Sequence, residues 1–213
     1  HNGVLYMVGN SRAFTRSTDL GATWSPVQTI AIPGGSTVIT RMYAVTFRGN
    51  DILVAGEGGS IYKANNPQGT QWSLFYDPIF GYISVNDIQF MNNNQGVMVG
   101  SGPTQSAIYY TANRGNTWQR KALASNSFYR SISMKQDGKG IVVGSTGYST
   151  TTNFGQNWST PLSIQPSSSA YTKCWLKNNG DFFVGTNPGA PVNDGLIRRS
   201  GTTWSQFTDM IQV

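Results

Sequence analysis

Acidic side chains are the first candidates for chemistry in this chain of 213 residues, which holds nine Asp and Glu residues in total. Glycoside hydrolysis, for example, needs two carboxyl groups about 5 to 10 Å apart. Glu57 is the only glutamate and follows an apolar run, in the segment Gly56–Gly59, so it is the best single acid candidate. Exposed acids need no function, however, and a solvated loop glutamate is the more common explanation. Catalysis by Glu57 is therefore the alternative interpretation, with candidate partners Asp77, Asp87, Asp194 and Asp209.

Other reactive groups are scarce. Cys174 is the only cysteine and His1 the only histidine, so the sequence offers neither an internal disulfide nor a thiolate or imidazole metal site. Cys174 stands in an apolar stretch, where we expect it to pack. P-loop, Cys-x-x-Cys and Gly-x-Ser-x-Gly motifs are missing from the sequence. We therefore expect no metal and no cofactor.

The charge pattern restricts the class of partner. The formal net charge is +6, and only 11% of residues are charged. Basic residues form no run, since only Arg120 with Lys121 and Arg198 with Arg199 are adjacent, which argues against nucleic acid. The sequence has no apolar run long enough to span a bilayer. The polar surface consists of Asn, Ser, Thr and Gln, a bias typical of secreted and virion proteins, so we expect an extracellular or virion-surface location.

One octapeptide, Ser17 to Trp24, recurs along the chain and predicts a tight hairpin turn. Asp19 can accept hydrogen bonds from the backbone N–H groups that follow it, and Gly21 supplies the positive φ that the turn needs. The segments 111–118 and 151–158 repeat the pattern with Asn113 and Asn153 in place of Asp. Because Asn keeps the acceptor oxygen but cannot act as a general acid, this segment indicates structure and not catalysis.

Two series of markers divide the chain into five units of about 40 to 48 residues. In the first series a glycine stands three residues before a tryptophan that closes the turn; the tryptophans are Trp24, Trp72, Trp118, Trp158 and Trp204. In the second series a glycine ends an apolar run; these glycines are Gly9, Gly56, Gly100, Gly144 and Gly185. Five copies of each marker predict five structural units.

Each unit is typical of four short strands, with β-branched and aromatic residues separated by Gly, Asn and Pro turns. Four-stranded units of this length, repeated several times, predict a five-bladed β-propeller of antiparallel blades in one domain, residues 1–213. A solenoid would need one or two strands per unit and atypical polar ends, which the sequence lacks.

The first unit lacks its first strand, because only Asn2 and Gly3 precede its apolar run. In the other units the first strand carries an apolar pair two residues apart: Val45 and Phe47, Ile88 and Phe90, Ile132 and Met134, Cys174 and Leu176. Counting back from Gly9 into the C-terminus places Ile211 and Val213 on the same two positions. We therefore expect the C-terminal strand, Asp209–Val213, to complete the first blade and close the ring, with the termini close together.

The octapeptide resembles the Asp-box, or BNR repeat, of the form Ser/Thr-x-Asp-x-Gly-x-Thr-Trp. The resemblance covers the whole chain through Ser17, Asp19, Gly21, Thr23, Trp24, Gly69, Trp72, Asn113, Gly115, Trp118, Asn153, Gly155, Trp158, Gly201 and Trp204. Proteins with this repeat include sialidases, lectins, sortilin-type receptors and photosystem assembly factors. The resemblance implies structural boxes in the turn between the third and fourth strands of each blade. It does not favour the sialidase branch, because this chain has one glutamate and five units instead of six.

The face opposite the boxes is the expected ligand side of such a propeller. Its candidate binding residues are Arg12, Arg41, Glu57, Tyr82, Tyr129, Arg130, Tyr148, Tyr171 and Asp194. Aromatic rings beside hydrogen-bonding groups suit sugar rings or protein surfaces, although packing between blades is the more common role of any single aromatic.

These observations favour a lectin-like, non-catalytic recognition or scaffold module. Its expected partner is a glycan or a protein surface, outside the cell or on a virion such as a phage tail or fibre. Neighbouring termini would allow the domain to be part of a larger polypeptide or virion assembly. The alternative is a small propeller glycoside hydrolase centred on Glu57.

Overall fold

The computed structural model describes residues 3–31, 41–76, 84–101, 106–121, 128–145, 147–165, 171–186 and 195–207. These residues form strands and turns, with one 3-10 turn, η1 (Glu57–Gly59). In the described ranges no helix has the length and apolar character needed to cross a membrane. The protein is therefore all-β, as the sequence predicts.

The strands form five antiparallel sheets that follow one another along the chain and are called blades 1 to 5. Blade 1 contains β1 (Leu5–Val8), β2 (Ala13–Ser17) and β3 (Gln28–Thr29). Blade 2 contains β4 (Met42–Arg48), β5 (Asp51–Gly56), β6 (Ile61–Ala64) and β7 (Trp72–Tyr76). Blade 3 contains β8 (Ser84–Phe90), β9 (Gly96–Ser101), β10 (Ser106–Thr111) and β11 (Gln119–Lys121).

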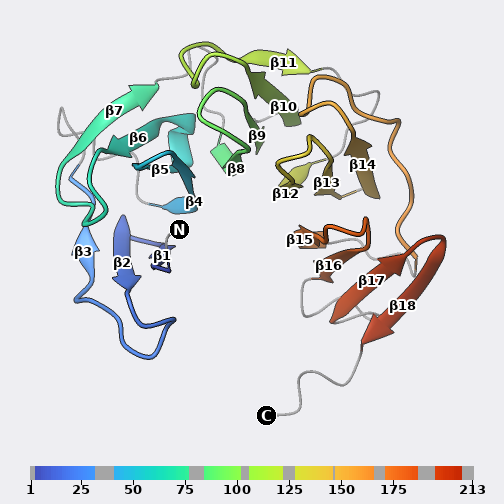
Figure 1. The fold of residues 1–213 in the computed structure, drawn as a ribbon, viewed down its shortest axis with the longest axis horizontal. Helices are drawn as coiled ribbons and strands as arrows, with labels where there is room; N and C mark the ends of the chain where they lie inside the picture. Colours follow the sequence, from blue (N-terminus) through green and yellow to red (C-terminus); the bar gives the residue numbers. More distant parts are fainter. Residues whose placement is uncertain are drawn as a thin grey trace.

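The last two blades follow the same order. Blade 4 contains β12 (Tyr129–Met134), β13 (Gly140–Gly144) and β14 (Gly147–Thr151). Blade 5 contains β15 (Tyr171–Leu176), β16 (Phe182–Thr186), β17 (Leu196–Ser200) and β18 (Thr203–Phe207). The five sheets lie around one central axis, and β4, β8, β12 and β15 are the strands nearest to it in their blades (Figure 1).

The prediction of four strands per unit is confirmed for blades 2, 3 and 5 only. In blade 4 the fourth strand is reduced to an isolated bridge between Tyr148 and Leu162. Pro161 precedes this bridge, and proline has no N–H group with which to extend a ladder. Blade 1 has three strands among the described residues, and the predicted fourth, Asp209–Val213, lies outside them.

Four hydrophobic clusters hold consecutive blades together. Each cluster combines side chains of two neighbours, from blades 1 and 2 through to blades 4 and 5. Fully burying one large aliphatic side chain contributes about 1.5–3 kcal/mol, so these clusters are the main source of stability. The described residues form no such cluster between blades 5 and 1, where Leu5, Met7 and Trp175 remain exposed.

The repeated octapeptide forms the predicted turn after the third strand position. In the first copy Asp19 Oδ1 accepts the Thr23 N–H at 2.9 Å, Asp19 Oδ2 accepts the Thr23 hydroxyl at 2.5 Å, and Ser17 Oγ accepts the Gly21 N–H at 2.8 Å. In the second copy Asn113 Oδ1 accepts the Thr117 N–H at 3.0 Å, but its amide donates to the Thr117 hydroxyl at 2.8 Å. Asn can therefore take the place of Asp in this turn. The only change is that the side chain donates a hydrogen bond to the threonine hydroxyl, where Asp accepts one from it.

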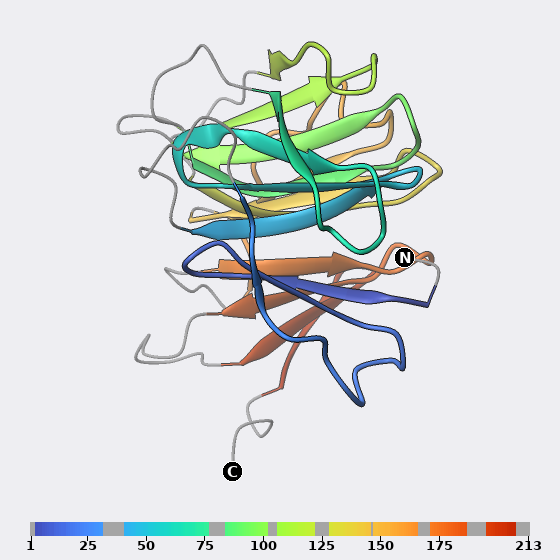
Figure 2. The ribbon, with the colours of Figure 1, turned by 90° about the vertical axis from the view of Figure 1, so that its left-hand side faces the viewer.

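The glycine of this turn lets neighbouring blades approach closely. Gly69 has a φ of +65°, and a Cβ there would lie 2.6 Å from the Phe14 ring of blade 1. Gly155 has a φ of +83°, and a Cβ there would lie 2.5 Å from Val97 of blade 3. The recurrent glycine therefore serves both the local turn and the contact between blades. Figure 2 shows the blades from the side, with strands running between two end faces.

The first turn predicts a specific acid sensitivity. Hydrogen bonds from the Thr23 hydroxyl, the Thr23 N–H and the Ser17 hydroxyl lower the pKa of Asp19 to about 2. The unfolded pKa is about 3.9, so the ionised carboxylate stabilises the fold above about pH 4, and this contribution is lost as the pH falls toward 2. Asp19→Asn keeps one acceptor, so the difference in melting temperature between wild type and variant should shrink over this range.

The matched control is the second turn. Asn113→Asp should introduce an acid-dependent difference of the same sign, because an aspartate already occupies this place in the first turn. Thermal melts followed by circular dichroism at several pH values measure both effects. A difference between wild type and Asp19→Asn that stays constant across the range would contradict the assignment.

Candidate functional site

The inner strands of blades 2 to 5 share one irregularity, a β-bulge near the start of the strand. In each strand one residue has no partner on the second strand, so the pairing skips it. The skipped residues are Tyr43, Asn86, Arg130 and Thr172. A bulge re-aims a side chain and bends the strand, and such bulges are frequent beside binding sites. The same change of side-chain direction therefore occurs in four blades around one axis.

Two of the glycines that end the apolar runs, Gly56 and Gly144, explain how the bulges of blades 2 and 4 fit. A Cβ on Gly56 would lie 2.0 Å from the Arg41 carbonyl oxygen, and one on Gly144 would lie 2.9 Å from the Phe128 carbonyl oxygen. Any larger residue would collide with the backbone just before the bulge. These glycines therefore permit the close approach of the first strand to the second.

The four bulge residues line one cavity of about 400 Å³, together with Ser101, Phe128 and Lys173. We call this cavity the channel-mouth pocket. Its residues lie at the starts of inner strands and the end of β9, on the face opposite the turns that follow the third strands. Tyr43 and Phe128 are 38% and 47% exposed, so part of each ring remains available to a ligand.

The lining of the channel-mouth pocket combines basic and polar groups with two aromatic rings. Among the described residues, the exposed Arg130 guanidinium makes no hydrogen bond and no ion pair. Lys173 Nζ lies 3.4 Å from Asp87 Oδ2, and 62% of its side chain is exposed. Asn86 donates to the Tyr129 carbonyl at 2.7 Å, and Thr172 donates to the Gly185 carbonyl at 3.1 Å. The pocket thus offers two cations, two rings and two fixed polar groups.

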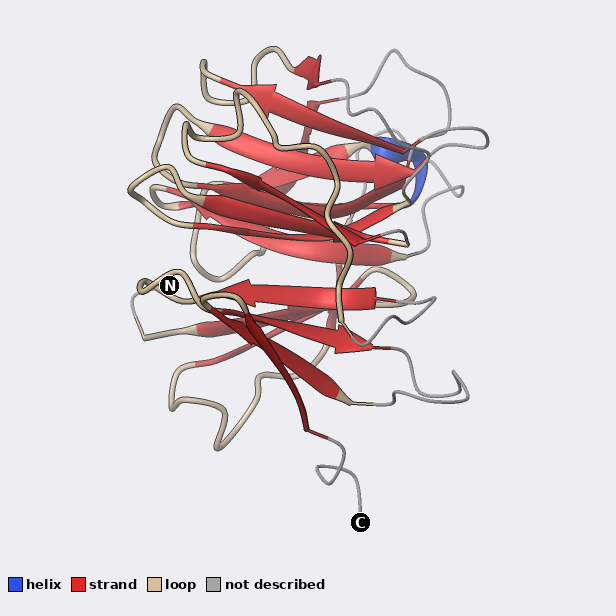
Figure 3. Cartoon of the chain, turned by 90° about the vertical axis from the view of Figure 1, so that its right-hand side faces the viewer, coloured by secondary structure: helices blue, strands red, loops and turns tan. Residues whose placement is uncertain are grey.

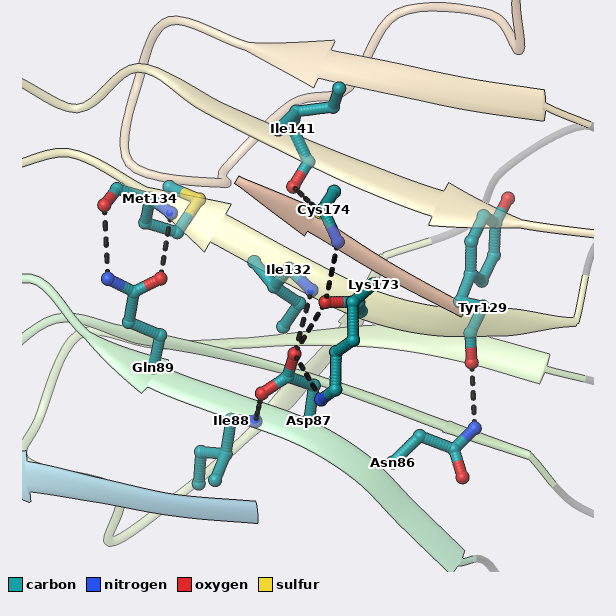
Figure 4. A network of polar contacts seen from close by, with 11 residues as sticks. Asn86, Asp87, Ile88, Gln89, Tyr129, Ile132, Met134, Ile141, Lys173 and Cys174 are labelled. Carbon is teal, nitrogen blue, oxygen red and sulfur yellow. Dashed lines mark hydrogen bonds and ion pairs between the residues drawn. The ribbon is translucent and has the colours of Figure 1, made fainter. Parts of the chain in front are cut away.

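A ladder of polar contacts supports this pocket (Figure 4). Asp87 Oδ2 accepts the Ser131 hydroxyl at 2.8 Å and the Ile132 N–H at 3.1 Å, while Asp87 Oδ1 accepts the N–H of Ile88 at 3.0 Å. Ser131 Oγ in turn accepts the N–H of Cys174 at 3.3 Å. Side chains of one blade thus accept hydrogen bonds from backbone N–H groups of the next blade, directly beside the bulges.

Gln89 extends the ladder from β8 to β12. Its Oε1 accepts the Met134 N–H at 2.7 Å, and its Nε2 donates to the Met134 carbonyl at 3.0 Å. In blade 4 Ser133 Oγ accepts the N–H of Leu176 at 2.9 Å. The inner edges of β12 and β15 are therefore capped by side chains instead of a further strand.

The structure distributes the residues of the predicted ligand face among different roles. Arg130 lines the channel-mouth pocket. Arg41 and Glu57 pair with each other: Glu57 Oε1 lies 3.7 Å from Arg41 Nε, and Glu57 Oε2 accepts the Arg41 N–H at 3.1 Å. Arg12 lies in the turn between β1 and β2, where its carbonyl accepts the Ile30 N–H at 2.9 Å. In Figure 3, η1 with Glu57 lies at the opposite end of the blades from the N-terminus.

Three predicted binding tyrosines belong to the core. Tyr129, Tyr148 and Tyr171 are only 2%, 3% and 2% exposed, and they pack in the clusters between blades 3 and 4 and between blades 4 and 5. Their rings are therefore not available at the surface, which corrects their assignment to the ligand side. Tyr82 and Asp194, the remaining candidates, lie outside the described residues.

Carboxylates in the described part of the chain are committed to structural contacts. Asp19 belongs to its turn, and Asp87 to the ladder. Asp51, Asp137 and Asp181 pair with Arg48, Lys139 and Arg198. Among the described residues no group of three or more His, Cys, Asp or Glu could hold a metal ion. Burial raises the pKa of the Cys174 thiol to about 12, as expected for a packed cysteine.

Sequence reasoning missed most of the pocket. Tyr43, Asn86, Thr172 and Lys173 were not among the candidates, although a signal was present. Each bulge residue stands two positions before the first member of the apolar pair, as Asn86 stands before Ile88. The bulge shifts the alternation by one residue, so that Val85 and Ile88, and likewise Tyr129 and Ile132, are buried although they stand three positions apart.

Five antiparallel sheets around one axis, with a pocket at the channel mouth, define the β-propeller class. No protein-family model matches the chain, and no curated protein matches it. Comparison with solved structures supports the class. YCF48 bound to a D1 peptide is similar with a TM-score of 0.66 at 21% identity, over 97% of this chain and 63% of that one.

Two further structures have the same architecture. An ancestral GH74 enzyme matches with a TM-score of 0.67 at 22% identity, over 98% of this chain and 30% of the enzyme. A chain of a nidogen/laminin complex matches with a TM-score of 0.68 at 11% identity, over 92% of this chain and 71% of that one. At such low identity the likeness concerns the fold alone. This chain spans less than two thirds of the YCF48 chain and about a third of the GH74 enzyme.

The ladder predicts a measurable contribution from Gln89. Gln89→Ala should lower the free energy of unfolding by about 1–3 kcal/mol, because both backbone groups of Met134 lose their partner. Gln119→Ala, on the exposed surface of β11, is the control and should stay within about 0.5 kcal/mol of wild type. Urea denaturation measures both values, and equal losses in the two variants would show that the ladder does not act as described.

Proposed function

We propose that this chain is a non-catalytic recognition module that binds a glycan or a protein surface through the face opposite the repeated turns. The channel-mouth pocket carries the proposal, because two partly exposed rings and two exposed cations line the same cavity. Pockets of a few hundred Å³ with convergent polar groups are the usual form of small-ligand sites. Tyr43, Phe128, Arg130 and Lys173 would contact the partner.

The alternative, a glycoside hydrolase centred on Glu57, has less support. Glu57 holds the Arg41 backbone and guanidinium, and the other described carboxylates have structural partners. A general acid must be able to reach its substrate, which these contacts hinder. The similarity to GH74 enzymes keeps the alternative open to test, whereas YCF48 bound to a D1 peptide and the nidogen/laminin complex are examples of binding propellers.

We also propose an extracellular or virion-surface location for the module. The support is compositional: only 11% of residues are charged, and Asn, Ser, Thr and Gln supply the remaining polar surface. A virion or a larger extracellular polypeptide would present such a module in many copies.

A glycan panel separates the two functions. The wild type should retain labelled glycans without cleaving them, and Glu57→Gln should retain them as well. Affinity electrophoresis measures retention, and mass spectrometry of the incubated glycans measures hydrolysis. Hydrolysis by the wild type that is abolished in Glu57→Gln would reject the binding module and establish the enzyme.

We propose that the C-terminal strand, Asp209–Val213, completes blade 1 and closes the ring of blades, so that the face opposite the repeated turns surrounds a complete channel. The apolar side chains of Leu5 and Met7 on β1, and of Trp175 on β15, support this proposal, because they are 41%, 53% and 55% exposed in the described part of the chain although each stands on an inner strand. The register of Ile211 and Val213 matches the apolar pairs of the other inner strands.

Ring closure predicts a cost for shortening Ile211. Ile211→Ala should lower the free energy of unfolding by about 2 kcal/mol or more, as expected for a buried isoleucine. Gln212→Ala, its neighbour on the other side of the strand, should have a much smaller effect. Thermal or urea denaturation distinguishes these variants, and two near-neutral substitutions would argue for an open ring.

A further inference from the structure

The side chains that line the channel-mouth pocket indicate the chemistry of its ligand more specifically than the size of the cavity does. Arg130 presents an exposed guanidinium that has no partner in the described part of the chain. Arginine binds carboxylates through two parallel hydrogen bonds, which makes it the side chain best suited to this group. Lys173 adds a second positive charge, and its contact with Asp87 at 3.4 Å leaves most of the side chain exposed.

The rings indicate the rest of the ligand. Tyr43 and Phe128 line the same cavity as the two cations, and part of each ring faces the open space. Aromatic faces pack well against the C–H groups of a sugar ring, while hydroxyl and amide groups such as Ser101 and Asn86 suit sugar hydroxyls. A small inorganic anion would use the cations but not the rings.

We propose that the channel-mouth pocket binds a carboxylated sugar ring, a hexuronic acid unit of an acidic polysaccharide. Arg130 binds the carboxylate, Lys173 adds to the attraction, and Tyr43 and Phe128 pack against the ring. The cavity of about 400 Å³ is within the range of small-ligand sites. This inference rests on the proposed recognition function and names the ligand of the same face.

The bulges explain how blades that are far apart in the sequence contribute to one pocket. Arg130 and Thr172 come from blades 4 and 5, and Tyr43 and Asn86 from blades 2 and 3. Each of these residues is itself the unpaired residue of its bulge, so each of the four blades contributes a bulge side chain to a single pocket. A ligand at this point contacts several blades at once, which favours selectivity over contact with a single loop.

The experiment uses trigalacturonate and trimannuronate as probes, titrated into the full chain by isothermal calorimetry. At least one probe should bind, with an affinity that falls as salt increases, since part of the attraction is between charges. The methyl ester of the same trimer removes the charge and should bind about tenfold more weakly or not at all. Equal binding of the ester would overturn the role of the carboxylate.

Variants locate the site. Arg130→Gln should weaken binding about tenfold or more, and Arg130→Lys should lie between it and the wild type, because lysine keeps the charge but not the paired hydrogen bonds. Lys139→Gln is the matched control, an exposed cation in the turn between β12 and β13 on the opposite face. Melting curves should be unchanged for Arg130→Gln, since Arg130 has no described partner. Unchanged affinity in Arg130→Gln would overturn the proposal.

Two further outcomes separate this inference from the proposed function. Hexaglutamate that binds as tightly as the sugar acids, with the same dependence on Arg130, would overturn the sugar in favour of a protein carboxylate. Failure of both uronate probes at millimolar concentration would overturn the inference, while retention of a neutral glycan by the same protein would leave the recognition function standing.

Discussion

The inner edges of the blades impose the constraint on which the rest of this structure depends. A strand beside a central channel has backbone N–H groups that point away from its own sheet and must find partners. In blades 4 and 5 these partners are side chains of the preceding blade. Asp87 accepts a hydrogen bond from the N–H of Ile132, Gln89 accepts one from Met134, and Ser131 accepts one from Cys174. Each contact begins on one blade and ends on the next, so the ladder fixes the rotation between neighbouring sheets.

The candidate site follows from this ladder. In blades 3 and 4 the bulge residue stands directly before a residue that caps the neighbouring blade: Asn86 precedes Asp87, and Arg130 precedes Ser131. The capping residue holds the inner strand in place, and the bulge residue before it is presented to the channel mouth. Rigid support of this kind is what positions a binding group well.

Acidic and basic side chains have different roles in this structure, and the difference bears on function. Described carboxylates are engaged in turns, the ladder or ion pairs, whereas Arg130 remains without a described partner and Lys173 stays largely exposed. Acidic residues therefore stabilise the fold, while basic residues at the channel mouth are available to an anion. This division supports recognition over acid/base catalysis and is consistent with the replacement of Asp by Asn in two of the turns.

Local signals in the sequence determined the repeated turns, the five units and the all-β class, because short-range hydrogen bonds and the period of two in strands depend on neighbouring residues. The sequence also placed Arg130 on the face opposite the repeated turns, where it lines the channel-mouth pocket. Only the tertiary structure decided that Tyr129, Tyr148 and Tyr171 pack in the core and that Tyr43, Asn86 and Thr172 reach the channel mouth. A single unpaired residue decides which way a strand side chain points, and that depends on the neighbouring strand.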